Sequence, residues 1–214
     1  MAIFRGITAE EEAASGLMWC LRELEYVGAS YLMPRNHVHK HAAIPFLRII
    51  GLFFGQTFDK TLKEYGLHIK DEDGQRRLML AFPIKVAGED TWAYPIPPLN
   101  FGVSVAGTGL PPSYATQISA YVTAKGANSI KSYLKKEANL RNEILYAGPD
   151  GYPQVPELKA EFIQEKTSHV LTLLQTYLLI QPYPERQPYV QDALTAFLSV
   201  VGAIGSQGGA SNEV

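Results

Sequence analysis

The stretch IPFLRIIGLFFGQTFDKTLKEYG, residues 44–66, carries the strongest structural signal in this chain. Apolar side chains recur in it every three or four positions from Ile44 to Tyr65, which is the spacing of one helix face. Gly66 follows the last of them, and glycine is common just after a helix end. We therefore expect a long helix here, at the centre of a helical protein.

Further segments show the same helical spacing and are separated by prolines and glycines. Thr8 and Glu11 have the spacing of a capping box, which predicts a helix over residues 9–32. Other helices are expected from 113 to 146 with an interruption at Gly126, from 156 to 180, and from 189 to 204.

Residues 78–96 depart from the helical period. Two short β-rich runs, 78–86 and 91–96, flank a polar turn and predict a β-hairpin, after a polar loop at 70–77. The prolines of these runs cannot donate ladder hydrogen bonds, so both strands are expected at sheet edges. The predicted fold class is mainly α, a helical bundle with a small β-hairpin insertion at about 78–96. Residues 1–204 are expected to form a single helical domain, and the Gly/Ser-rich residues 205–214 a disordered tail.

Composition excludes several classes of protein. The chain has 214 residues, 46% of them hydrophobic and 19% charged, with a net charge of −2, so neither a disordered segment nor a basic nucleic-acid coat is expected. Cys20 is the only cysteine, which rules out an internal disulfide and favours a reducing compartment. No run approaches the roughly twenty apolar residues of a membrane span. We expect a cytoplasmic protein without a membrane partner.

The segment LRNEILY, residues 140–146, ends one predicted helix just before the loop that leads to the next. Arg141 and Asn142 are followed, after three more residues, by Tyr146. Here the sequence resembles the HEPN superfamily of helical domains, whose motif is an Arg, usually followed by a polar residue, with a His four to six residues further on. The likeness covers residues 113–180, and Tyr146 stands where that family has its His.

The resemblance implies an RNA-associated protein of a stress or defence system, often a homodimer, that uses no metal and no other cofactor. In catalytic members the Arg stabilises the charge on phosphorus while the His transfers protons, which makes the enzyme a metal-independent endoribonuclease. Arg141, Asn142 and Tyr146 would form that site, although a phenol with a pKa near 10 is a poor base at neutral pH. The alternative is a non-catalytic protein–protein interaction or scaffold module with a degenerate HEPN-like site.

A local excess of positive charge lies beside this motif, between residues 125 and 146. Lys131, Lys135 and Lys136 are the candidates for binding RNA phosphates, and Tyr133 or Tyr152 can stack on bases. A solvated helix face would show the same residues.

A second Arg–polar–His spacing joins Arg35 and Asn36 to His41. It stands before the central helix and not before the last long helix, which is the wrong place for the HEPN motif. A composite site would combine Arg141 with a histidine of this segment.

Two other arrangements remain open. If residues 37–41 are extended, His37, His39 and His41 point to one side and suit a divalent metal, although a solvated segment is the alternative. Glu165 and His169 stand four residues apart on one helix face, where a structural hydrogen bond is expected.

The motif predicts that Arg141→Ala abolishes RNA cleavage, because the variant loses the guanidinium that would hold the phosphate. The measurement is incubation of the wild type and the variant with mixed labelled RNAs in EDTA, followed by analysis of the ends. Cleavage by the wild type alone, with 2′,3′-cyclic phosphate ends, supports the ribonuclease. Absence of cleavage by both proteins contradicts it and favours the interaction module.

Overall fold

The computed structural model describes residues 2–58, 65–72, 74–145 and 160–205, and within them the chain is mainly helical, as predicted. The helices are α1 (Ala2–Glu23), the short 3₁₀ helix η1 (Ala29–Tyr31), α2 (His37–Phe58), α3 (Ala115–Ala124), α4 (Ile130–Leu145), α5 (Ala160–Ile180) and α6 (Pro188–Gly205). The strands are β1 (Gly66–Glu72), β2 (Gln75–Val86) and β3 (Glu89–Ala93). The predicted fold class, a helical bundle with a small β insertion, is confirmed.

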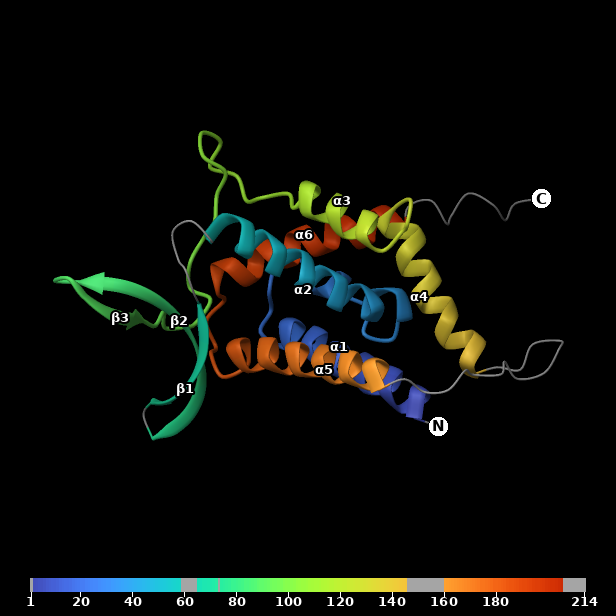
Figure 1. The fold of residues 1–214 in the computed structure, drawn as a ribbon, viewed down its shortest axis with the longest axis horizontal. Helices are drawn as coiled ribbons and strands as arrows, with labels where there is room; N and C mark the ends of the chain where they lie inside the picture. Colours follow the sequence, from blue (N-terminus) through green and yellow to red (C-terminus); the bar gives the residue numbers. More distant parts are fainter. Residues whose placement is uncertain (1, 59–64, 73, 146–159, 206–214) are drawn as a thin grey trace.

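The helices α1 and α5 lie side by side and run in the same direction (Figure 1). The helix α2 packs against both and also contacts α3, α4 and α6. Side chains at the centre of this arrangement are almost fully buried, among them Ala14 of α1, Ile49 of α2 and Leu173 of α5. The central position predicted for the helix around residue 44 is therefore correct.

The first two helices begin and end elsewhere than predicted. The helix α1 begins at Ala2, so Thr8 lies inside it and the predicted capping box is wrong. The helix α2 begins at His37, because the Oδ1 of Asn36 accepts the backbone N–H of Val38 at 2.8 Å and caps this end. Gly66, predicted to end α2, instead opens β1, and residues 59–64 between them lie outside the described part.

Cys20 lies in the core and is 3% exposed. Burial, with a contribution from Glu23, raises the pKa of its thiol to about 11. The thiol is therefore protonated at neutral pH and acts as a small apolar side chain.

The sheet has three strands in the order β1-β2-β3, all antiparallel, and projects from one end of the helices (Figure 1). The predicted hairpin is present as β2 and β3, but the expected polar loop at 70–77 is wrong. Residues 70–72 belong to β1 and residues 75–77 to β2, with Lys70 opposite Arg77, and Arg77 forms an ion pair with Glu72 at 3.1 Å.

The strand β3 lies at an edge of the sheet, as predicted, whereas β2 lies between β1 and β3, contrary to the prediction from its proline. Residues 75–81 pair with β1, whereas residues 82–86 pair with β3. Pro83 lies in the second half, opposite Trp92, where only one side of β2 is paired. The missing N–H of Pro83 is tolerated there because no ladder on the β1 side needs it.

None of the helices in the described part of the chain is long and apolar enough to cross a membrane. Gly126, at φ 63°, separates α3 from α4 as the sequence predicted. The predicted disordered tail lies, from residue 206 onward, outside the described residues.

Gln187, which directly precedes α6, joins three separate segments and is 1% exposed. Its Oε1 accepts the N–H of Leu99 at 2.7 Å, and its Nε2 donates to the carbonyl of Leu179 at 2.9 Å. Its own backbone N–H donates to the hydroxyl of Tyr26 at 2.9 Å. This side chain therefore ties the connector before α3 to the end of α5.

We predict that Gln187→Ala lowers the free energy of unfolding by about 3 kcal/mol, because it removes the partner of the part-buried N–H of Leu99 and of the buried carbonyl of Leu179. Gln191→Ala is the matched control, since Gln191 bridges the N–H and carbonyl of Val27 in the same way at a solvent-exposed position. Its loss should stay below about 1 kcal/mol, because water replaces both bonds. Urea unfolding measures both values. Equal losses of stability for the two variants would contradict the role of Gln187 as a buried link between the connector and α5.

Candidate functional site

Two adjacent carboxylates of α1, Glu10 and Glu11, are buried, at 5% and 3% exposed. A buried charge is tolerated only when it is paired and hydrogen-bonded. Each of the two carboxylates is paired with a different helix, so α1 is held between α2 and α5 at this level.

Glu11 faces the first turns of α2. Its Oε1 accepts a hydrogen bond from the Nδ1 of His37 at 2.9 Å, and its Oε2 lies 3.3 Å from the Nζ of Lys40. The Nε2 of His41 lies 3.1 Å from Oε1 but is not oriented for a hydrogen bond. Burial lowers the pKa of His41, although Glu11 and Glu10 oppose that shift. We infer that His41 is neutral at neutral pH.

Glu10 faces α5. Its Oε2 accepts hydrogen bonds from the Nζ of Lys166 and the Nδ1 of His169, both at 2.8 Å. Burial raises the pKa of Glu10, but these two partners outweigh burial and bring the pKa from 4.5 down to about 2. Glu10 is therefore ionised over the physiological pH range.

The imidazole of His169 connects Glu10 to Arg48 of α2. The Nη2 of Arg48 lies 2.8 Å from the Nε2 of His169. A guanidinium can only donate, so Nε2 must be the acceptor and the proton of a neutral imidazole must sit on Nδ1, facing Glu10. The contacts therefore define the tautomer of His169 that is protonated on Nδ1, and its unprotonated Nε2 faces Arg48.

Arg48 lies at the boundary between this buried chain of contacts and solvent, since 39% of its side chain is exposed. Glu165 lies 3.9 Å from it, which is a weak ion pair at this exposure. One edge of the guanidinium is thus held by His169 and Glu165, and the side chain as a whole borders an open pocket.

This polar pocket has a volume of about 490 Å³ and lies among α1, α2, α3, α4 and α5. Its ionisable and phenolic lining residues are Glu10, His41, Arg48, Tyr121, Lys125, Tyr133, Lys136, Glu137, Glu165, Lys166 and His169. The hydroxyl of Tyr121 donates to that of Tyr133 at 3.4 Å, and burial raises the pKa of both phenols. The phenols therefore stay protonated and can act as hydrogen-bond donors.

The arrangement combines a partly exposed guanidinium, a neutral imidazole and lysines at the rim. Guanidinium and ammonium groups bind phosphate oxygens, and an imidazole nitrogen that is free to accept a proton can act as a base. The geometry therefore suits recognition of a phosphate ester and proton transfer beside it.

The residues predicted from the motif are placed only in part. Arg141 and Asn142 lie in the last turns of α4, but their side chains are outside the described part, as is the whole of Tyr146. Of the three predicted RNA-binding lysines, only Lys136 lines the polar pocket. Lys131 and Lys135 belong to the same helix but do not line it.

The histidines of residues 37–41 do not converge as an extended segment would require, because these residues form the first turns of α2. His37 and His41 approach Glu11, whereas the ring of His39 packs edge-on against Phe197. In the described ranges no group of three His, Cys, Asp or Glu residues is arranged to hold a metal ion.

Glu165 lies 3.6 Å from the Nε2 of His169, which is beyond hydrogen-bond distance, so the hydrogen bond predicted between them is not formed. The hydrogen bonds of His169 go to Glu10 and Arg48, neither of which belongs to a sequence motif. A signal for Glu10 existed, because it occupies an apolar position of the helix face between Ile7 and Ala14.

Comparison with known proteins does not place this chain in a family. No protein-family model matches this chain, and neither a curated protein nor a solved structure matches it. The resemblance of residues 140–146 to the HEPN motif therefore stays a prediction.

We predict that Glu10→Gln lowers the free energy of unfolding by about 3 kcal/mol at neutral pH, because Lys166 loses its buried counter-ion. The folded-state pKa of Glu10 is below its ordinary value, so its contribution is present above pH 4.5 and is lost as pH falls toward about 2. The difference between variant and wild type should shrink across that window.

Urea unfolding at a series of pH values measures this difference. Glu12→Gln is the control, because Glu12 is exposed on the same helix and should give little change at any pH. A stability difference for Glu10→Gln that is independent of pH would contradict the lowered pKa of Glu10.

Proposed function

We propose that this protein binds RNA by its phosphates in the polar pocket and cleaves it without a metal ion. One observation carries the proposal: Arg48 and His169 lie 2.8 Å apart, and buried Glu10 holds the imidazole as the tautomer that can accept a proton. Arg and His are also the residue types that the HEPN resemblance implies, although these two stand elsewhere in the sequence.

Binding would begin with the guanidinium of Arg48. Phosphate oxygens are stronger acceptors for it than a neutral imidazole nitrogen, since the hydrogen bond is then between opposite charges. Lys125 and Lys136 have exposed side chains at the same pocket and add attraction for the strand. Moving Arg48 onto the phosphate leaves the Nε2 of His169 available to the neighbouring ribose.

The reaction would be an internal transfer of the phosphoryl group. The 2′-oxygen forms a bond to phosphorus, and its proton passes to the Nε2 of His169. The bond from phosphorus to the 5′-oxygen breaks, and that oxygen takes a proton from water. Arg48 stabilises the extra negative charge on the phosphoryl oxygens, and Glu10 stabilises the imidazolium until it returns its proton to solvent. The products are a 2′,3′-cyclic phosphate and a 5′-hydroxyl.

A second function, self-association, is favoured by the outer face of α5. Ile163, Leu171, Leu174 and Leu178 share that face by helical spacing and are between 39% and 52% exposed. A row of large apolar side chains on one helix suits contact with a second copy of the chain. This surface fits the homodimer that the sequence led us to expect, and it would remain as the function if no RNA is bound.

We predict that Arg48→Ala and His169→Gln each reduce RNA cleavage in EDTA by about a hundredfold or more, the usual scale for losing a charge stabiliser or a general base. Arg76→Ala is the matched control, because Arg76 is exposed on the sheet and should cleave at the wild-type rate. An RNA with a single 2′-deoxy nucleotide should resist cleavage at that position only, since the nucleophile is missing there.

Three outcomes would contradict the proposal in different ways. Undiminished cleavage by Arg48→Ala and His169→Gln would remove the reaction from the polar pocket. Loss of cleavage in Arg141→Ala alone would move it to the motif at the end of α4. Absence of RNA binding and cleavage by the wild type would leave self-association as the function.

A further inference from the structure

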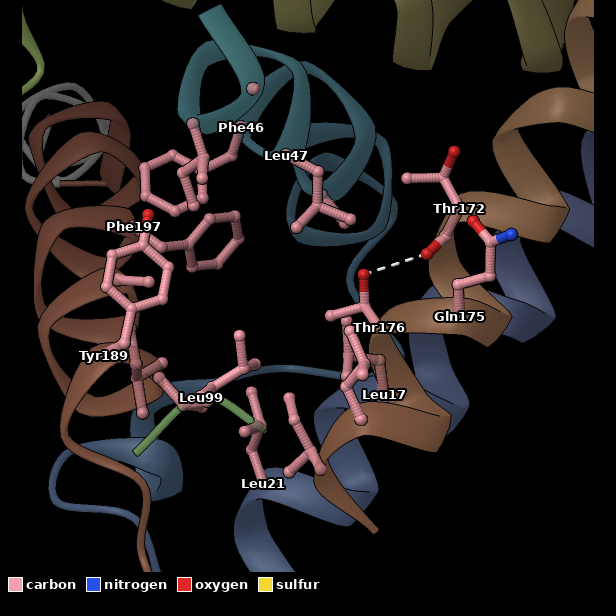
Figure 2. A pocket seen from close by; sticks show the side chains of 18 of the residues that line it. Leu17, Leu21, Phe46, Leu47, Leu99, Thr172, Gln175, Thr176, Tyr189 and Phe197 are labelled. Carbon is pink, nitrogen blue, oxygen red and sulfur yellow. Dashed lines mark hydrogen bonds between the residues drawn. The ribbon is translucent and has the colours of Figure 1, made fainter. Parts of the chain in front are cut away.

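A second cavity, separate from the polar pocket, lies where α1, α2, α5 and α6 surround a space of about 380 Å³. Figure 2 shows the side chains that point into it, Leu17 and Leu21 from α1, Phe46 and Leu47 from α2, and Tyr189 and Phe197 from α6. Among the described residues, none lines both this cavity and the polar pocket. The two cavities can therefore be occupied and tested independently.

Part of the cavity wall toward the sheet is held in place by a hydrogen bond. Leu99 lines it, and the N–H of Leu99 is bound by the buried amide of Gln187. This end is also lined by Leu80 and Phe82 of β2 and by the solvent-exposed Tyr65 and Leu67. The backbone at Leu99 is therefore held in place by Gln187 and needs no ligand to position it.

The described lining contains no charged side chain. Besides the tyrosines Tyr65 and Tyr189, its polar side chains come from one face of α5, namely Thr172, Gln175 and Thr176, of which Gln175 is exposed. The hydroxyl hydrogens of Thr172 and Thr176 are donated to backbone carbonyls one turn earlier, so these oxygens face a ligand as acceptors. The side-chain amide of Gln175 can both donate and accept.

Size and lining together define the class of molecule that fits. The cavity is roughly two and a half times the engineered apolar cavity of 150 Å³ that binds one benzene. An apolar space of this size is in the range of small-molecule sites, which are mostly apolar with a few polar groups that fix orientation. A carboxylate here would lack a counter-ion, whereas a hydroxyl can donate to Thr172 or Thr176.

We propose that this cavity binds an uncharged, elongated apolar molecule with one hydroxyl group, seated with its chain among the leucines and its hydroxyl at α5. Binding does not depend on the phosphate chemistry of the polar pocket. The occupant is recognised by the absence of charge and by the acceptor oxygens at the mouth of the cavity.

The test uses 1-octanol as the probe and octanoate as its charged counterpart, added to the full-length protein in a calorimetric titration. We expect 1-octanol to bind with one-to-one stoichiometry and octanoate to bind at least about tenfold more weakly, which corresponds to roughly 1.4 kcal/mol. Equal affinity for the two, or no binding of 1-octanol, would overturn the proposal.

Two variants locate the binding. Leu47→Trp places a larger side chain in the cavity and should weaken 1-octanol at least about tenfold, while thermal unfolding checks that the variant is folded. Gln175→Arg supplies a cation at the mouth, on an exposed position that tolerates substitution, and should raise the affinity for octanoate about tenfold. Unchanged binding of 1-octanol to folded Leu47→Trp, or of octanoate to Gln175→Arg, would contradict this placement.

Discussion

The need to neutralise two buried carboxylates, Glu10 and Glu11, is the constraint on which the arrangement of the helices depends. They are consecutive in α1 and so face different neighbours. Lys40, His37 and His41 of α2 surround one, while Lys166 and His169 of α5 surround the other. Removing either helix would leave a charge in the interior without a partner, which costs several kcal/mol. Apolar packing is less specific than these ion pairs in determining that α2 faces Glu11 and α5 faces Glu10.

The same two parallel helices separate polar from apolar chemistry along their length. In α1 the face that carries Glu10 continues one turn later as Ala14 and then as Leu17. In α5 it continues from His169 to Leu173. The polar pocket therefore lies toward the amino ends of α1 and α5, and the apolar cavity toward their carboxyl ends. The helices α1 and α5 line both candidate binding sites. The side chains on each turn determine whether that turn faces the polar pocket or the apolar cavity.

Local periodicity was enough to predict the helices, the hairpin and the mainly α class, because these patterns depend only on neighbouring residues. The polar network could not be predicted in that way, since Arg48 and His169 are far apart in sequence and meet only when α2 packs on α5. Asn36 caps α2 one residue before His37, and this local signal favours a helix over an extended segment for the histidines. Glu10, a carboxylate within an apolar helix face, was the clearest available sign of a buried partner.

The most direct test of this account is the protonation pattern of His169, read from the nitrogen-15 and proton correlations of its imidazole near neutral pH. The chain of contacts from Glu10 to Arg48 predicts a single neutral tautomer with the proton on Nδ1 and none on Nε2. Arg48→Ala should keep the Nδ1 proton, because Glu10 still accepts it, and should alter the environment of Nε2. A proton found on Nε2, or an averaged signal typical of a solvent-exposed imidazole, would contradict the account.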